Sequence, residues 1–317
     1  MTEGSRRAIL AAFAANAGIA VAKFVGFFAT GAASLLAEAV HSVADSANQG
    51  LLILGGARSG REPTTAHPFG YGRERYFWAF VVAMVLFTLG SLFAIYQGVE
   101  KVRHPHELTD PQWAIGILVL GVLFEGFSLR TAVREANKVR KGVGWWAFIR
   151  RARSPELPVV LLEDLGALLG LMFALVGIGL AIWTGDPRFD ALGSIAIGIL
   201  LGVIAVVLAS EMKSLLIGES AQAGNRKQIA EAIETSDSVE RLIHLRTQHI
   251  GPDELLVAAK VVLDPTLAGR ELADAIDRIE VRIREVVPIS ELIFIEPDVY
   301  RPDREGDAPS VSRELGR

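Results

Sequence analysis

The residues best suited to chemistry are a histidine and an aspartate four positions apart inside an apolar stretch. His41 and Asp45 lie within residues 34–57, where most other residues are Ala, Val, Leu or Gly. Residues four apart on a helix lie on one face. Ionisable groups inside a membrane are costly, rare and usually functional. An imidazole beside a carboxylate is half of a site for a borderline metal ion.

The same helix face carries two more polar residues. Polar side chains recur at intervals of three, four and three, the spacing of one continuous helical stripe: Glu38, His41, Asp45 and Asn48. Such a stripe would make a poor surface toward lipid, so we expect it to line a cavity or to face another helix. Glu38 and Asn48 are secondary candidates for the metal site or for a proton path.

A pair of acids interrupts another apolar run. Glu163 and Asp164 are flanked by leucines, and Asp164 and Asp45 both lie roughly 17–20 Å from basic loop residues at a helical rise of about 1.5 Å per residue. Equal depth on two helices is what a shared site requires. Adjacent residues point about 100° apart on a helix. Both acids can hold one ion only if the longer Glu163 side chain bends round; otherwise one serves a proton path or another helix contact.

Two further charged residues lie in apolar runs. Glu125 is another candidate for the metal site or proton path, and Lys23 can neutralise one of the acids. For any single residue the alternative is a structural hydrogen bond between helices. That alternative is much less favourable for His41, Asp45 and Asp164 together, because three ionisable groups at one depth are costly unless something charged binds there.

Composition divides the chain into an apolar part and a charged part. The 317 residues have a mean hydropathy of +0.36 and are 51% apolar, values that soluble domains seldom reach. We expect a membrane domain over 1–217, a cytoplasmic domain over 218–300 and a disordered tail over 301–317. A net charge of −4 gives no sign of nucleic-acid binding. The absence of cysteine excludes disulfides, thiolate metal sites and cysteine nucleophiles.

Six apolar runs are long enough to cross a bilayer. They lie at about residues 8–29, 34–57, 76–100, 112–134, 157–183 and 189–212. Lys and Arg are concentrated near the N-terminus and in the second and fourth loops, which the positive-inside rule places in the cytoplasm together with both termini. Trp145 and Trp146 fit an interfacial anchor beside the fourth loop.

The charged part has the pattern of a small α+β domain. Amphipathic helices are predicted over 227–236 and 267–286, and strands over 239–250, 255–263 and 291–296. Gly251 and Pro252 form a turn between the first two strands. The predicted order of elements is αββαβ.

These motifs resemble the cation diffusion facilitator family of proton-coupled zinc and manganese exporters. Residues 34–45 read SLLAEAVHSVAD and residues 67–75 read HPFGYGRER. They are similar to the family's His/Asp-x-x-x-Asp metal motif and its His-x-Phe-Gly-His-Gly-Lys segment. The resemblance covers about residues 8–298. It implies an all-α membrane domain with six transmembrane helices, followed by a ferredoxin-like cytoplasmic α+β domain that dimerises.

The resemblance also implies a metal site, with one departure. The family usually repeats His-x-x-x-Asp on the fifth span, but here Val160 stands at the histidine position while Asp164 matches the aspartate. His41, Asp45 and Asp164 are then three of four ligands, and Glu163 is the substitute for the fourth. The Glu-Asp pair resembles an atypical branch that includes mitochondrial zinc transporters. A more oxygen-rich site is less selective against manganese and iron.

Secondary metal sites have weaker support. His67 begins the second-loop motif, but Tyr71 replaces a second histidine, so a helix-entry turn is favoured over a metal site. The C-terminal domain lacks histidines where family members often carry them. Glu296 keeps an acidic ligand, and His244 and His249 are candidates for a divergent site. We favour a structural dimerisation module over a metal sensor.

The expected function is export of a divalent cation, zinc first, from the cytoplasm by proton antiport with alternating access. Manganese, iron and cobalt are the alternatives. Metal binding needs a neutral His41 and ionised Asp45 and Asp164, so protons compete for the same atoms. An unperturbed histidine titrates near pH ~6.5, which makes His41 the expected proton carrier. No cofactor is expected: the metal ion is the transported substrate and protons are the counter-ion.

We expect an integral protein of a bacterial inner (plasma) membrane that forms a homodimer through its C-terminal domain and membrane helices.

Two alternative classes of function are an intramembrane metal-dependent hydrolase and a purely structural or regulatory membrane protein. A hydrolase needs an open metal position and a general base, but the chain has no His-Glu-x-x-His motif. Metal binding that is lost on changing Asp45 would exclude the structural class. We therefore expect a secondary active transporter rather than an enzyme.

Overall fold

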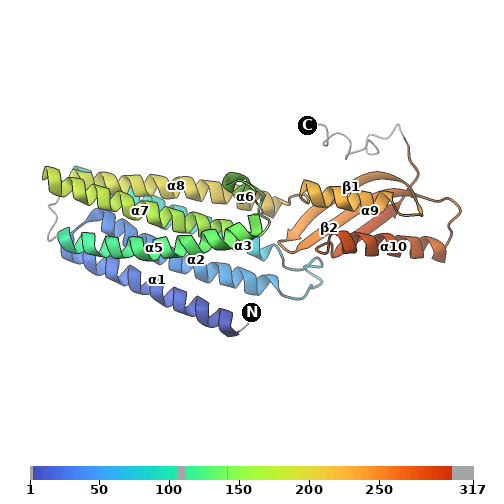
Figure 1. Ribbon diagram of the computed structural model, residues 1–317, viewed down its shortest axis with the longest axis horizontal. Coiled ribbons are helices and arrows are strands. Elements are labelled where there is room, and N and C mark those ends of the chain that lie inside the picture. The colour runs from blue at the N-terminus through green and yellow to red at the C-terminus, as the bar shows by residue number, and fades with distance from the viewer. Residues whose placement is uncertain (1–2, 106–110, 141, 302–317) are drawn as a thin grey trace. The chain divides into compact units, whose positions relative to one another are not determined.

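The computed structural model describes residues 3–105, 111–140 and 142–301 (Figure 1). Side chains are described from Ala17 onward. The chain folds as two compact units. The first contains residues up to Arg58 together with 75–213, and the second contains residues 59–74 together with those from Ser214 onward. All of the predicted tail except Arg301 lies outside the described residues.

The first unit is built from long helices: α1 (Glu3–Thr30), α2 (Ala33–Ser59), α5 (Pro111–Arg140), α7 (Glu156–Thr184) and α8 (Arg188–Ile217). The third apolar run is a continuous helix in three parts: α3 (Glu74–Val85), the π-helical η1 (Leu86–Leu92) and α4 (Phe93–Arg103). Within these helices proline occurs only at Pro111 and Pro158, both in a first turn, where the missing N–H costs no helical hydrogen bond.

Among the described residues, four helices are long and apolar enough to cross a membrane, namely α3–η1–α4 together, α5, α7 and α8. α1 is apolar over Ala17–Thr30, the part whose side chains are described. The mean hydropathy of α2 is lowered by its polar stripe. The prediction of a membrane domain is therefore supported by composition, whereas the number of six spans stays a prediction.

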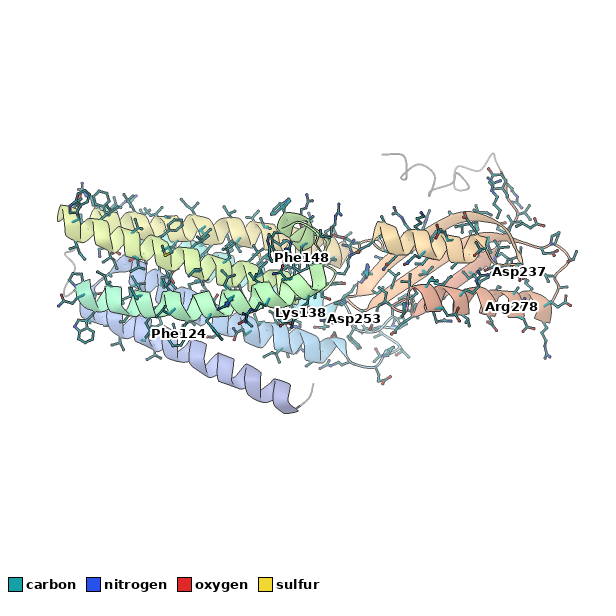
Figure 2. All side chains as sticks on the ribbon, viewed as in Figure 1. Phe124, Lys138, Phe148, Asp237, Asp253 and Arg278 are labelled. Atoms are coloured by element: carbon teal, nitrogen blue, oxygen red, sulfur yellow. The ribbon has the colours of Figure 1, made fainter. Side chains whose placement is uncertain are left out.

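The fourth loop contains a short helix that the sequence analysis did not predict. α6 (Trp145–Arg151) buries Phe148 and Ile149 and leaves Trp146 59% exposed. Figure 2 shows Phe148 on this helix. The guanidinium of Arg140 lies 4.3 Å from the ring centroid of Trp145. An exposed tryptophan on a basic, partly buried helix fits the predicted interfacial anchor.

Glycines let neighbouring helices of the first unit approach closely. A Cβ at Gly98 of α4 would lie 2.7 Å from the backbone of α8, and a Cβ at Gly198 of α8 would lie 2.8 Å from the carbonyl oxygen of Ser91. α7 and α8 meet in the same way, because a Cβ at Gly177 would lie 3.3 Å from the Cα of Gly193. Such small-residue contacts are typical between membrane helices. They set the positions of η1, α4 and α7 against α8.

One buried carboxylate joins three helices. Asp190 in the first turn of α8 accepts hydrogen bonds from the N–H groups of Ala33 (2.8 Å) and Ser34 (3.3 Å) and from the Ser34 hydroxyl, at the start of α2. Lys101 of α4 donates to Asp190 (3.0 Å) and to the carbonyl oxygen of Gly31 (2.8 Å). Asp190 is 0% exposed and Lys101 6%. Another helix thus supplies the acceptor that the free N–H groups of a helix start require.

The described part of the second unit contains a three-stranded sheet and two helices. Its elements are α9 (Ala223–Glu234), β1 (Val239–Gly251), β2 (Glu254–Leu263), α10 (Arg270–Val286) and β3 (Leu292–Pro297). β1 pairs antiparallel with β2, and β2 pairs parallel with β3. Alternate β2 residues such as Val257 and Val261 share a core with Ile229 of α9 and Ile279 of α10. The order is αββαβ, as predicted, with element ends shifted by a few residues.

Residues 59–74, which follow α2, pack on the β1–β2 hairpin within the second unit. A Cβ at Gly72 would lie 2.8 Å from the carbonyl oxygen of Ile250 and 2.9 Å from the Cα of Gly251. Only glycine allows this approach. The segment also turns back on itself, since Thr64 and His67 exchange backbone hydrogen bonds of 3.2 and 3.0 Å.

We predict that Asp190→Ala lowers the stability of the membrane domain by about 3–5 kcal/mol, because it leaves Lys101 buried without its carboxylate. Asp190→Asn keeps acceptor capacity and should lose less. Thermal unfolding of the protein in detergent is the measurement, with the exposed Glu135→Ala as the control. Equal unfolding midpoints for Asp190→Ala and the wild type would contradict the role given to this carboxylate.

Candidate metal centre

Helix α2 turns its polar stripe toward the inside of the helical unit. Glu38, His41 and Asn48 are 0% exposed, and the Asp45 side chain is 15% exposed. The stripe therefore faces other helices. Its four residues have different neighbours, which come from α1, η1, α5 and α7.

His41 and Asp45 form the centre of the stripe. His41 Nδ1 lies 3.5 Å from Asp45 Oδ1. Neither ring nitrogen of His41 nor Asp45 Oδ1 has a hydrogen-bond partner among the described residues. The π-helical η1 lies beside the ring, since a Cβ at Gly90 would be 3.9 Å from His41 Nδ1. Buried polar atoms are nearly always hydrogen-bonded, so these atoms are available to a ligand.

Glu38 is held by a lysine from α1. Lys23 Nζ lies 3.1 Å from Glu38 Oε2 and donates to Ser42 Oγ at 2.7 Å. Both ion-pair partners are buried, at 1% and 0% exposure. The other oxygen, Glu38 Oε1, packs against Gly170 of α7 and has no hydrogen-bond partner among the described side chains. The expectation that Lys23 neutralises one acid agrees with this contact.

The two acids of α7 point in different directions. Glu163 is 5% exposed and accepts a hydrogen bond from the Asn48 amide of α2. Asp164 is half-buried and accepts a hydrogen bond from Ser128 Oγ of α5 at 2.8 Å. The structure therefore brings Glu163 rather than Asp164 into contact with the stripe. The divergence is what adjacent helical residues impose.

A narrow crevice joins α1, α2 and α5. It is lined by Ile19, Ser42, Asp45 and Glu125. Glu125 is half-buried, and the charges of Glu125 and Glu163 both act on Asp45. The crevice gives Glu125 a direct relation to the centre of the stripe.

These acids do not form a closed metal shell in this arrangement. Among the described residues there is no group of three or more His, Asp or Glu side chains set around one point. The acids instead occupy separate hydrogen bonds with Asn48 and Ser128. Gathering them around one cation requires Glu163 or Asp164 to leave those neutral partners. Such an exchange is favourable for a carboxylate that gains a divalent ion.

The secondary candidates lie in the second unit. The His67 ring packs on Tyr71 with centroids 4.6 Å apart, a contact that suits the predicted turn. His249 is 2% exposed, and its Nδ1 lies 3.4 Å from the carbonyl oxygen of Gly251. A metal-binding role for either histidine stays a prediction.

On the sheet, Lys260 stands between two other candidates. It pairs in register with His244 of β1 and with Glu296 of β3. Its Nζ lies 3.1 Å from Glu296 Oε1 and 3.0 Å from Asp298 Oδ2. Hydrogen bonds to Asp298 and Glu296 raise the pKa of Lys260, and the bond from Lys260 lowers the pKa of Asp298. The Lys260 ammonium thus forms ion pairs with Glu296 and Asp298, the two carboxylates that a metal ion at this place would need as ligands.

Several residues of the centre were not identified from the sequence alone. Ser42 was not singled out, although its position four residues after Glu38 places it on the same face. No sequence signal indicates Ser128 or Gly90, because their contacts with the centre depend on how α5 and η1 pack.

The second unit also has an open depression, lined in part by Asp237 and Arg278, whose side chains are labelled in Figure 2. Neither residue was a candidate.

Comparison with known protein families gives two matches. Residues 9–217 match the cation efflux transmembrane domain, and residues 222–299 match the cytoplasmic domain of cation efflux proteins. Together they account for nearly all of the described chain. Both descriptions belong to transport proteins, in agreement with the expectation of a transporter rather than an enzyme.

Individual relatives have moderate identity. The human mitochondrial proton-coupled zinc antiporter SLC30A9 is 31% identical over 294 residues, which are 92% of this chain and 52% of the relative. Metal tolerance protein C4 of Arabidopsis thaliana is 31% identical over 259 residues, 81% and 57% of the two chains. Zinc transporter ZitB of Escherichia coli is 28% identical over 201 residues, 63% and 58%. The chain spans about half the length of the curated relatives it matches.

We predict that Gly170→Ala destabilises the protein by about 1–3 kcal/mol, because its Cβ would overlap Glu38 Oε1 in a packed site. Gly179→Ala on the same helix is the matched control, since nothing lies within 4 Å of its Cβ position. Replacing glycine by alanine inside a helix by itself stabilises the helix by about 1 kcal/mol. This gain is the same for both variants, so the difference between them reports the contact with Glu38. Thermal unfolding in detergent compares them, and a Gly170→Ala midpoint at or above that of Gly179→Ala would contradict the packing of Glu38 on α7.

Proposed function

The chain belongs to the cation diffusion facilitator family, and on that premise we propose that it exports a divalent metal cation, zinc first, from the cytoplasm in exchange for protons. The cation is substrate rather than cofactor. Export by antiport would require a site inside the membrane domain that binds either the metal ion or protons and opens to one side at a time.

The main support is the set of unpartnered buried atoms on α2. Both nitrogens of His41 and one oxygen of Asp45 have no hydrogen-bond partner among the described residues, and the ring lies 3.5 Å from the carboxylate. Leaving such atoms unsatisfied costs about 1–3 kcal/mol each. A cation that binds them removes the cost. Glu125 lines the same crevice as Asp45, and Glu163 contacts Asn48 of the same stripe, so both can supply further oxygens.

Zinc is the proposed substrate because the donor set combines an imidazole nitrogen with carboxylate oxygens, which zinc accepts. The names of the human and Escherichia coli relatives also refer to zinc. Manganese, iron and cobalt remain the alternatives, because Val160 leaves the site with one histidine and several carboxylates.

Coupling follows from competition between metal and protons. The metal requires a neutral His41 and ionised carboxylates, so proton binding at these atoms favours metal release. We propose that α2 and α7 expose the site alternately to the two sides. The hydrogen bond from Asn48 to Glu163 would then break or move during each cycle, because it joins these two helices.

We also propose the setting in which the transporter works. Both termini would be cytoplasmic, in a bacterial inner (plasma) membrane, and two chains would form a homodimer through the C-terminal domain and membrane helices. The match of residues 222–299 to the family's cytoplasmic domain and the basic loops support the cytoplasmic termini and the homodimer.

We predict that Asp45→Ala abolishes zinc transport while the protein still folds and inserts, because the carboxylate at the centre of the stripe is lost. Proton-driven zinc uptake into proteoliposomes measures the effect. Glu135→Ala removes an exposed carboxylate of α5 and should transport normally. Retained uptake by Asp45→Ala would sink the assignment of the site.

We predict that Val160→His increases the preference for zinc over manganese, because it adds a nitrogen ligand one helical turn before Asp164. Competition between the two ions in the proteoliposome assay gives the ratio. Val160→Leu should leave the ratio unchanged. The same ratio for Val160→His and the wild type would count against our assignment of the fourth ligand.

A further inference from the structure

Lys23 is a positive charge inside the acidic part of the membrane domain. It is 1% exposed, and its ammonium contacts Glu38 Oε2 at 3.1 Å and Ser42 Oγ at 2.7 Å. Ser42 lines the crevice that also contains Asp45 and Glu125. The ammonium therefore lies at the edge of the space in which the carboxylates face one another.

Lys23 interacts with the same carboxylates that a transported cation would bind. It neutralises one oxygen of Glu38, whereas the second oxygen has no hydrogen bond within the described part of the chain. Its charge also acts on Asp45 and Glu125. A fixed positive charge at this place lowers the attraction of the carboxylates for any second cation, and the reduction is larger for a divalent ion than for a monovalent one.

We infer that Lys23 is a tethered counter-cation of the transport site. Its ammonium holds Glu38 when no cargo is bound and competes with the cargo for the carboxylates, so that the site releases a divalent ion readily. The inference rests on the proposed function, and it adds a positioning residue on α1 to the ligands on α2, α5 and α7.

The charge of Lys23 should affect the kinetics of transport. A transporter must bind its substrate and then let it go, and tighter binding of the ground state slows release. Removing the charge of Lys23 should therefore tighten metal binding and slow turnover. A lysine with a merely structural role would instead weaken binding and transport together when it is removed.

The test measures zinc binding to the detergent-solubilised full chain by calorimetry, and zinc transport in proteoliposomes. Lys23→Met should lower the Kd for zinc by at least about tenfold, since charges a few ångströms apart interact strongly even at an effective dielectric constant of about 20. It should lower both KM and kcat. Lys23→Arg keeps the charge, so its Kd for zinc should lie closer to that of the wild type than the Kd of Lys23→Met does.

A second pair of variants distinguishes the effect of the Lys23 charge on zinc binding from an effect of the substitution on folding. Glu38→Gln should weaken zinc binding, and Lys23→Met combined with Glu38→Gln should restore it toward the wild-type Kd, because the net charge is then restored. If Lys23→Met alone does not fold, the comparison of Glu38→Gln with the double variant carries the test. Neutral side chains at both positions also avoid a buried charge without a partner.

The outcomes distinguish the two proposals. A wild-type protein that binds zinc, combined with an unchanged or weaker affinity in Lys23→Met and no recovery in the double variant, overturns the role of Lys23 alone. A wild-type protein that binds no zinc, or whose binding is unaffected by Asp45→Ala, overturns the proposed function and this inference with it.

Discussion

The arrangement of the membrane domain depends on the cost of placing charged side chains among apolar helices. Each such group must find its partner within the protein, because a hydrocarbon environment offers none. At the start of α2 every such group has a partner, since Asp190 accepts hydrogen bonds from Lys101 and from the N–H groups of the helix. In the middle of the same helix it is met only in part, since His41 and Asp45 keep atoms without partners among the described residues. One end of α2 is therefore anchored, while its centre holds the atoms at which we propose that a cation binds.

Some contacts around this centre can be replaced by contacts to a cation, whereas others hold the helices together. Glu163 and Asp164 accept hydrogen bonds from an amide and a hydroxyl, which are weaker partners for a carboxylate than a cation is. Glycine contacts such as those at Gly98 and Gly198 keep the backbones of α4 and α8 close and resist separation. A rigid framework with exchangeable side-chain partners is suited to a site that must bind and release an ion.

Much of this organisation could be predicted from the sequence, because it is periodic. The spacing of Glu38, His41 and Asp45 placed them on one buried face, and alternation in the C-terminal part gave the αββαβ order that the structure has. Three features could not be predicted, because each depends on contacts between elements distant in sequence. They are the contact of Glu163 with Asn48, the role of Asp190 at the start of α2, and the short helix α6. The metal ligand set itself remains a prediction.

The packing of residues 59–74 on the β1–β2 hairpin affects how deletion variants are interpreted. Gly72 lies against the backbone of Ile250 and Gly251, and the same segment is covalently continuous with α2 and α3. A chain shortened before the hairpin would lose more than the αββαβ elements of the second unit. It would also leave the connection between α2 and α3 without the surface on which it folds, so a loss of transport in such a chain would not by itself assign a regulatory role to the C-terminal domain.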